Sequence, residues 1–259
     1  MGRIHLFEFE DQEWFPRLLR SYGTDYLRFL EVKMKIFQPV IPIIVKALNA
    51  GNTRVIVDLG SGSGGPLVWL NDKIKQKVPG LRIILTDYYP NLPAFSSISE
   101  TADNFSYHSE PVDARSVPKQ LPGLRTLFLT FHHFKRYDAR KILQDAIDSS
   151  HPIAIFEGQE RSVLSLLAML FSPLTVLFTT PFIRPFRIKR IIFTYLIPVV
   201  PLFVLWDGIV SSLRTYSVKE MKALVKELQN NDFDWETGKL RSGPVTILYM
   251  VGLPKNRFN

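Results

Sequence analysis

The sequence predicts an α/β fold in which helices pack on both faces of a mostly parallel sheet. Three observations support this fold class. Short apolar runs alternate with helical patterns from residue 54 to residue 157, a glycine-rich turn follows the first run, and the chain closes with two extended segments joined by a tight turn. Such alternation is typical of a doubly wound sheet, and the final hairpin adds antiparallel strands to it.

The first elements along the chain are helical. Residues 12–48 have an aromatic-rich start and then apolar side chains at helical spacing between Tyr26 and Phe37. Pro39 and Pro42 are expected to kink or divide this stretch.

Five apolar runs between residues 54 and 157 favour strands. Their β-branched content and their borders of glycine and polar residues are typical of strands buried in a parallel sheet. The runs lie at 54–60, 81–87, 104–108, 126–131 and 152–157. Helical patterns are expected between them at 65–77 and 137–149.

The C-terminal part predicts one more helix and the hairpin. Ser217 begins a helical segment, 217–232, and Glu220 three residues later completes a capping box. Two extended segments follow, 232–240 and 245–253, and a Ser-Gly-Pro turn joins them. Strands joined by such a turn must be antiparallel.

The glycine-rich turn is the central motif. Glycines there let the backbone turn tightly and come close to a ligand, and Asp87 at the end of the second strand is placed to accept hydrogen bonds from ribose hydroxyls. Gly60, Gly62 and Gly65 also satisfy the G-x-G-x-x-G pattern of dinucleotide sites, so these residues alone leave the cofactor open. No Gly-Lys-Ser/Thr follows, which excludes a Walker A loop.

A family resemblance favours one cofactor. Residues 57–64, Val-Asp-Leu-Gly-Ser-Gly-Ser-Gly, resemble motif I of class I S-adenosylmethionine-dependent methyltransferases, whereas dehydrogenases usually carry an apolar residue where Asp58 stands. The resemblance covers roughly 50–160 and the C-terminal hairpin, and it implies a Rossmann-like domain that binds S-adenosyl-L-methionine. It places Asp58 near the methionine end, Asp87 at the ribose and Asp113 at the adenine amino group. The implied cofactor-binding residues are Asp58, Gly60, Ser61, Gly62, Gly64, Asp87, Tyr88, Asp113 and Ala114.

The candidate catalytic residues are His132, His133 and Glu157. The segment Leu129 to Phe134 resembles the fourth-strand region of small-molecule and lipid methyltransferases. Methyl transfer needs alignment and, for a hydroxyl acceptor, removal of a proton, which histidine accepts near neutrality. If the strand alternates there, the two rings point to opposite sides, with His133 as the base and His132 towards the cofactor. No metal site is predicted.

Composition excludes several other classes. The chain has 259 residues, no cysteine and a net charge of +8. Without cysteine there are no disulfides or thiolate metal sites, and the cytosine C5 methylation mechanism is excluded. No basic stripe interleaved with aromatic residues is evident, so no nucleic-acid partner is expected. The N-terminal residues lack a signal-peptide pattern, which favours a cytoplasmic protein.

An apolar insertion follows the fifth strand. Residues 163–206 contain two uncharged runs of 21 and 16 residues and, between them, four bases and no acid. Prolines interrupt both runs, so a kinked hairpin that docks on a membrane surface is expected ahead of two straight spans. An apolar lid over the site is the alternative. The polar stretch after it, including Asp207 and Arg214, is expected to line the acceptor pocket.

These observations divide the chain into three parts. Residues 1–50 form N-terminal helices, residues 51–160 and 215–259 form the cofactor-binding domain, and residues 161–214 form the apolar helical insertion. The expected activity is S-adenosylmethionine-dependent methylation of a hydrophobic small molecule or lipid by a membrane-associated cytoplasmic enzyme. The alternatives are a dinucleotide-binding oxidoreductase and a non-catalytic membrane-binding protein with the same fold.

Overall fold

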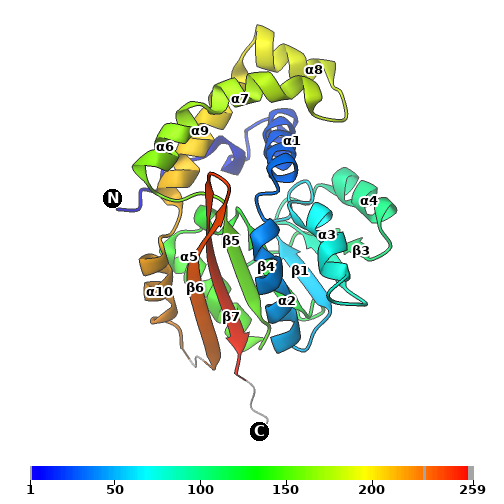
Figure 1. Ribbon diagram of the computed structural model, residues 1–259, viewed down its shortest axis with the longest axis vertical. Helices are drawn as coiled ribbons and strands as arrows, with labels where there is room; N and C mark the ends of the chain where they lie inside the picture. The colour runs from blue at the N-terminus through cyan, green and yellow to red at the C-terminus, as the bar shows by residue number, and fades with distance from the viewer. Residues whose placement is uncertain (1, 230–231, 256–259) are drawn as a thin grey trace.

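The computed structural model describes residues 2–229 and 232–255. Within these residues, seven strands form one sheet in the order β3-β2-β1-β4-β5-β7-β6 (Figure 1). Strand β7 is antiparallel to both of its neighbours, and every other pair is parallel. The strands are β1 (Val55–Leu59), β2 (Arg82–Thr86), β3 (Phe105–Tyr107), β4 (Leu124–Phe128), β5 (Ile153–Glu157), β6 (Phe233–Ser242) and β7 (Val245–Pro254). The predicted fold class and hairpin are confirmed.

Helices cover both faces of the sheet. Apolar side chains of α2, α3 and α4 pack on one face, and those of α5 and α10 pack on the other. The helices are α1 (Arg17–Met34), α2 (Ile41–Ala50), α3 (Leu67–Lys75), α4 (Leu92–Thr101), α5 (Arg136–Asp148) and α10 (Val218–Val225). Because side chains alternate along each strand, the two faces have separate apolar cores.

The insertion lies beyond the carboxyl ends of the parallel strands, together with α1 (Figure 1). It consists of α6 (Val163–Leu170), α7 (Ser172–Thr179), α8 (Ile188–Ile191), the π-helical turn Ile192–Leu196 and α9 (Val199–Arg214). A third apolar core joins α1 to the insertion through Tyr22 and Tyr26 on one side and Phe203 and Val204 on the other. The insertion therefore packs on the N-terminal helix rather than on the sheet.

The insertion helices are short and bent. Pro173 lies in the first turn of α7, and Pro198 directly precedes α9. The helices therefore break at prolines, in agreement with the predicted kinks. Among the described residues, no single helix has the length and apolar composition to cross a bilayer. Two pairs of consecutive helical segments reach that length and apolar composition when each pair is taken together. Residues 163–170 and 172–182 meet at an angle of 44°, and residues 188–196 and 199–214 meet at 76°.

Three local predictions need correction. The fourth strand ends at Phe128 rather than at residue 131, because Leu129 adopts φ +51° and breaks the extended backbone. Helix α4 was not expected, although the Asn91 side chain accepts a hydrogen bond from Ala94 N and so caps it. The helix expected over 217–232 ends at Val225.

The predicted capping box is present, because the Ser217 and Glu220 side chains each accept the other's backbone N–H. The helical stretch 12–48 is divided into α1 and α2 by the turn at Lys35 to Val40, which contains Pro39, so the predicted division is confirmed. Parts of three predicted segments lie outside the described residues: residue 1 of the N-terminal helices, residues 230–231 of the helix 217–232, and residues 256–259 of the C-terminal domain.

Candidate functional site

Asp58, the fourth residue of β1, is buried beneath the glycine loop. Its Oδ1 accepts a hydrogen bond from Thr126 Oγ1 at 2.6 Å, and its Oδ2 accepts one from Ser61 Oγ at 2.7 Å. Burial raises the pKa of Asp58 to about 7, although the two hydroxyl groups offset part of the shift. The sequence thus places a carboxyl whose charge is costly at the start of the loop.

The loop itself has a backbone that favours glycine. Gly62 has φ +55° and Gly64 has φ +101°. A Cβ at Gly64 would lie 2.2 Å from Ile98 Cδ1, whereas a Cβ at Gly62 would have no atom within 4 Å. The backbone conformation and the packing against Ile98 therefore both favour glycine at position 64, whereas Gly62 leaves open space beside the backbone. Gly60, at φ +76°, packs against the Thr130 side chain.

Asp87 follows β2 and joins that strand to the loop. Its Oδ2 accepts the Gly62 N–H at 2.8 Å, and its Oδ1 accepts the Tyr89 N–H at 2.8 Å. Burial raises the pKa of this carboxyl, and the two backbone hydrogen bonds oppose the shift. Tyr88 is exposed and packs edge-on against Tyr89. Asp87 therefore lies beside the open face of Gly62, where its acceptor oxygens can reach a ligand.

The Asp113 side chain is bound by Arg115. Its carboxylate forms an ion pair with Arg115 at 2.7 Å, and this pair holds the pKa of Asp113 below its usual range. Arg115 also pairs with Asp138, while Ala114 is buried in the core of that face. The adenine contact expected of Asp113 stays a prediction, and it requires the carboxylate to share its hydrogen bonds with Arg115.

Helix α1 contacts the glycine loop at Ser63. Thr24, Arg28 and Glu31 are spaced so that they share one helix face. Thr24 Oγ1 lies 3.2 Å from Ser63 Oγ, and Arg28 donates to the Ser63 carbonyl at 3.3 Å. Glu31 is buried, and burial together with the charge of Asp58 raises its pKa to about 8. Two acids with raised pKa values, Glu31 and Asp58, therefore lie close to the loop.

The histidine pair lies in a 3₁₀ turn, Phe131–His133, and not at the end of a strand. The strand alternation that was expected to separate the rings is therefore absent, and their centroids lie 4.2 Å apart. His132 Nδ1 lies 2.8 Å from Glu157 Oε2, and the His132 backbone N–H donates to Glu157 Oε1 at 3.0 Å. Glu157, the last residue of β5, thus fixes both the ring and the backbone of His132.

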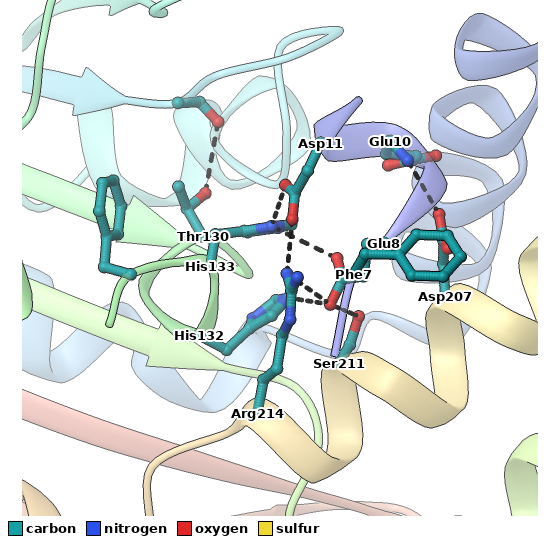
Figure 2. A network of polar contacts seen from close by, with 12 residues as sticks. Phe7, Glu8, Glu10, Asp11, Thr130, His132, His133, Asp207, Ser211 and Arg214 are labelled. Atoms are coloured by element: carbon teal, nitrogen blue, oxygen red, sulfur yellow. Dashed lines mark hydrogen bonds and ion pairs between the residues drawn. The ribbon is translucent and has the colours of Figure 1, made fainter. Parts of the chain in front are cut away.

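Two acids from the N-terminal segment complete this cluster (Figure 2). His133 Nδ1 lies 2.7 Å from Asp11 Oδ1 and 3.3 Å from Glu8 Oε2. Arg214 pairs with both acids, at 2.6 Å from Asp11 and 3.2 Å from Glu8. Burial alone would lower the pKa of His133, but the carboxylates of Glu8 and Asp11 outweigh it and raise this pKa to about 9.

The polar residues of α9 hold the N-terminal segment in place. Asp207 accepts the backbone N–H groups of Phe9 and Glu10 at 2.8 and 3.1 Å, and Arg214 donates to the Leu6 carbonyl at 2.7 Å. Burial raises the pKa of Asp207 to about 6. Asp207 and Arg214 therefore bind the segment 6–11, and their expected place in an acceptor pocket stays a prediction.

The glycine loop and the histidine cluster meet at one edge of the sheet. Thr130, directly before the 3₁₀ turn, contacts Gly60, and the charge of His133 acts on Asp87. Sequence reasoning found both parts but missed Glu8 and Asp11, because residues 1–11 show neither period nor motif. The one available signal was the density of acids in Phe-Glu-Phe-Glu-Asp.

Comparison with known proteins separates fold from function. No protein-family model matches the sequence, and no curated protein matches it significantly. Three similar solved structures each have a TM-score of 0.51. An O-methyltransferase family protein from Burkholderia thailandensis is 14% identical, and the match covers 92% of this chain and 63% of that chain. Human N-acetylserotonin methyltransferase in complex with S-adenosylmethionine is also 14% identical, with 94% and 59% covered. Mitomycin 7-O-methyltransferase is 16% identical, with 94% and 60% covered.

The fold is that of the class I methyltransferases. This chain spans 59 to 63% of the length of those three proteins, so the similarity concerns a shared part of each. Within the class I methyltransferase fold, the glycine loop and the histidine cluster lie at the carboxyl edge of the parallel strands, which is the edge where such sheets bind ligands.

Proposed function

We propose that this protein transfers a methyl group from S-adenosyl-L-methionine to a hydrophobic small molecule or lipid, at oxygen or carbon ahead of nitrogen. The observation that carries the proposal is the open face of Gly62, whose N–H donates to Asp87, at the ligand-binding edge of a class I methyltransferase fold. The same loop begins at the buried acid Asp58. When bound, the cofactor supplies an activated methyl group on a sulfonium.

The residues present fit such a cofactor. Asp87 presents carboxylate oxygens beside Gly62, where they suit ribose hydroxyls. Asp58 and Glu31 are buried acids, and burial raises the pKa of both, although the charge of Arg28 offsets part of the shift at Glu31. A ligand with an ammonium group and a sulfonium would remove the cost of charging them.

The acceptor is proposed to meet the methyl group at His132, His133 and Glu157. The cluster adjoins the glycine loop through Thr130, so an acceptor held there lies next to the cofactor site. The carboxylates around the rings offer places for the proton that a hydroxyl or carbon acid must lose. An acceptor reaches His133 when Asp11 or Glu8 gives way, since both contact its Nδ1. Two of the similar structures are named for small-molecule acceptors, N-acetylserotonin and mitomycin.

The insertion is proposed to dock on a membrane surface. Its outer side exposes large apolar side chains, including Leu164, Phe171, Phe178, Phe182 and Leu196. Exposed large apolar side chains with bases nearby in the same segment are typical of contact with anionic lipid. Three of the four bases are exposed, but Arg190 is buried and pairs with Asp25 at 2.9 Å. The bases available to lipid are therefore Arg184, Arg187 and Lys189.

Calorimetric titration with S-adenosylhomocysteine tests the cofactor, with NADH and NADPH titrated in parallel. We expect micromolar binding of S-adenosylhomocysteine that is lost in Asp87→Ala and kept in the control Asp103→Ala, an exposed acid paired with Lys75. Tight binding of a nicotinamide dinucleotide without S-adenosylhomocysteine would instead identify an oxidoreductase. Binding without turnover on any hydrophobic acceptor would favour the non-catalytic alternative.

Sedimentation with anionic vesicles tests the membrane contact. Changing Arg184, Arg187 and Lys189 to Ser should release the protein, because about 1 kcal/mol of attraction is lost per base near a charged surface. The matched control changes Lys219, Lys222 and Lys226 to Ser, which removes the same charge from exposed positions on α10 and at its C-cap. Equal sedimentation of the two triple variants would contradict the proposed docking surface.

A further inference from the structure

Two histidine rings and a buried carboxylate face a common point at the carboxyl edge of the sheet (Figure 2). One ligand atom each from Glu8, His132 and His133 can be chosen so that all three lie within 4.8 Å of one another. Oε1 of Glu8 is 3.9 Å from His132 Nε2, and the other oxygen, Oε2, is 3.3 Å from His133 Nδ1. Ligand atoms on a tetrahedral zinc ion are separated by about 3.3 to 3.6 Å, given bonds of about 2.0 to 2.2 Å. The separation between Glu8 and His133 lies in that range, and the separation between Glu8 and His132 is about 0.3 Å longer than its upper end.

His132 is oriented as metal-binding histidines are. Its Nδ1 donates to Glu157, so in the neutral ring Nε2 carries a lone pair. That Nε2 is buried and faces the Glu8 oxygen at 3.9 Å, which is too long for a hydrogen bond. A carboxylate behind the ring is the arrangement that fixes the tautomer of a histidine ligand.

The charges around the rings favour a bound cation. Three carboxylates, those of Glu8, Asp11 and Glu157, are balanced by one guanidinium, that of Arg214. The acids outnumber the guanidinium in a cluster where Glu8, Glu157 and Arg214 are almost fully buried, and the positive charge of His133 offsets part of this excess until a metal ion replaces its proton. Unbalanced buried charge is costly, and one divalent ion would cancel it.

We propose that Glu8, His132 and His133 bind a divalent transition-metal ion, zinc by preference. Two histidines and a glutamate with a fourth position left open form the ligand set of catalytic zinc sites, and imidazole ligands favour zinc over magnesium or calcium. Asp11 gives up its hydrogen bond to His133 and stays paired with Arg214. In this form the histidines are ligands, and the open position takes water or an acceptor oxygen, which deepens the proposed function.

The experiment is zinc titration of the full chain after chelator treatment and dialysis, in competition with a chromophoric chelator. We expect one equivalent to bind, with affinity at least tenfold weaker in His132→Ala. Glu157→Gln keeps the size of the side chain and should weaken binding by about 10- to 100-fold, as expected of a group that orients a ligand. His108→Ala is the control, because this histidine lies after β3 and not in the cluster.

Cobalt provides a second measurement that does not depend on affinity. Co²⁺ in place of zinc should give the visible absorption of a four-coordinate site, and His133→Ala should abolish it while far-UV circular dichroism stays unchanged. Wild-type protein that binds no zinc, or equal affinities in His132→Ala and His108→Ala, would overturn the metal site. Because S-adenosylhomocysteine binding is measured without metal, loss of the metal site would leave the proposed methyl transfer standing.

Discussion

The buried acid at the start of the glycine loop makes cofactor affinity depend on pH. Asp58 has its pKa raised to about 7, chiefly by burial. Near the cationic methionine end of the cofactor, its ionised form is favoured, so binding of the cofactor releases a proton from Asp58. Affinity should therefore rise as pH increases through 7 and level off above it.

The size of the effect follows from the fraction of Asp58 that is ionised. With a pKa of about 7, this fraction is about 0.09 at pH 6 and about 0.91 at pH 8. The dissociation constant for S-adenosylhomocysteine should therefore fall about tenfold between these pH values. Glu31, whose pKa is about 8, would extend the dependence to higher pH if it also contacts the ligand.

Calorimetry at pH 6, 7 and 8 measures this dependence in wild type, Asp58→Asn and Glu31→Gln. Asp58→Asn keeps the shape of the side chain and removes its titration, so its affinity should be weak and nearly constant across this range. Glu31→Gln should keep the tenfold change that Asp58 causes. A flat profile in wild type, or the same slope in Asp58→Asn, would refute the assignment of the charge to Asp58.

Three other predictions concern stability and local order. Without ligand, Asp58→Asn should stabilise the protein at pH 8 but not at pH 3. Because the pKa of Asp58 is higher in the folded protein than its unfolded value of 3.8, the contribution of Asp58 to folding is greatest below pH 3.8 and is lost as pH rises to about 7. The free energy of unfolding changes by about 4 kcal/mol at most over this range. Equal stability of both proteins at pH 8 in urea denaturation would contradict this. Arg190→Ala should cost about 3 to 5 kcal/mol, because it leaves Asp25 and the Ile183 and Pro185 carbonyls without their buried donor. The exposed Arg184→Ala should change the free energy of unfolding by less than about 0.5 kcal/mol, and similar values for the two would argue against the buried pair. Asp207→Ala should speed amide hydrogen exchange at Phe9 and Glu10, whereas Asp207→Asn, which keeps one acceptor oxygen, should do so less; unchanged exchange would show that the segment is held by other contacts.

The sheet was predictable because its strands depend on local composition. Runs such as 54–60 and 152–157 are β-branched, apolar and bounded by glycine or polar residues, and they form β1 and β5. The capping box at Ser217 was likewise encoded within four residues. Patterns of this kind need no knowledge of distant contacts.

The histidine cluster was only partly predictable, since it depends on long-range contacts. His132, His133 and Glu157 follow strand ends, and the rule that ligands bind at the carboxyl edge finds them. Glu8 comes from a segment without regular secondary structure, and Arg214 lies more than 200 residues away in sequence. The orientation of the rings also depended on Leu129, whose left-handed backbone ends β4 three residues before the place expected from its apolar pattern.

The segment 6–11 links two parts of the molecule that the sequence separates. On one side its acids contact His133, and on the other its backbone is bound by Asp207 and Arg214 of α9. A ligand that takes the place of Glu8 or Asp11 therefore acts on a segment that is also bound to α9. If such a ligand changes the affinity of the protein for a surface that contacts α9, thermodynamic reciprocity requires that the surface change the affinity for the ligand by the same factor.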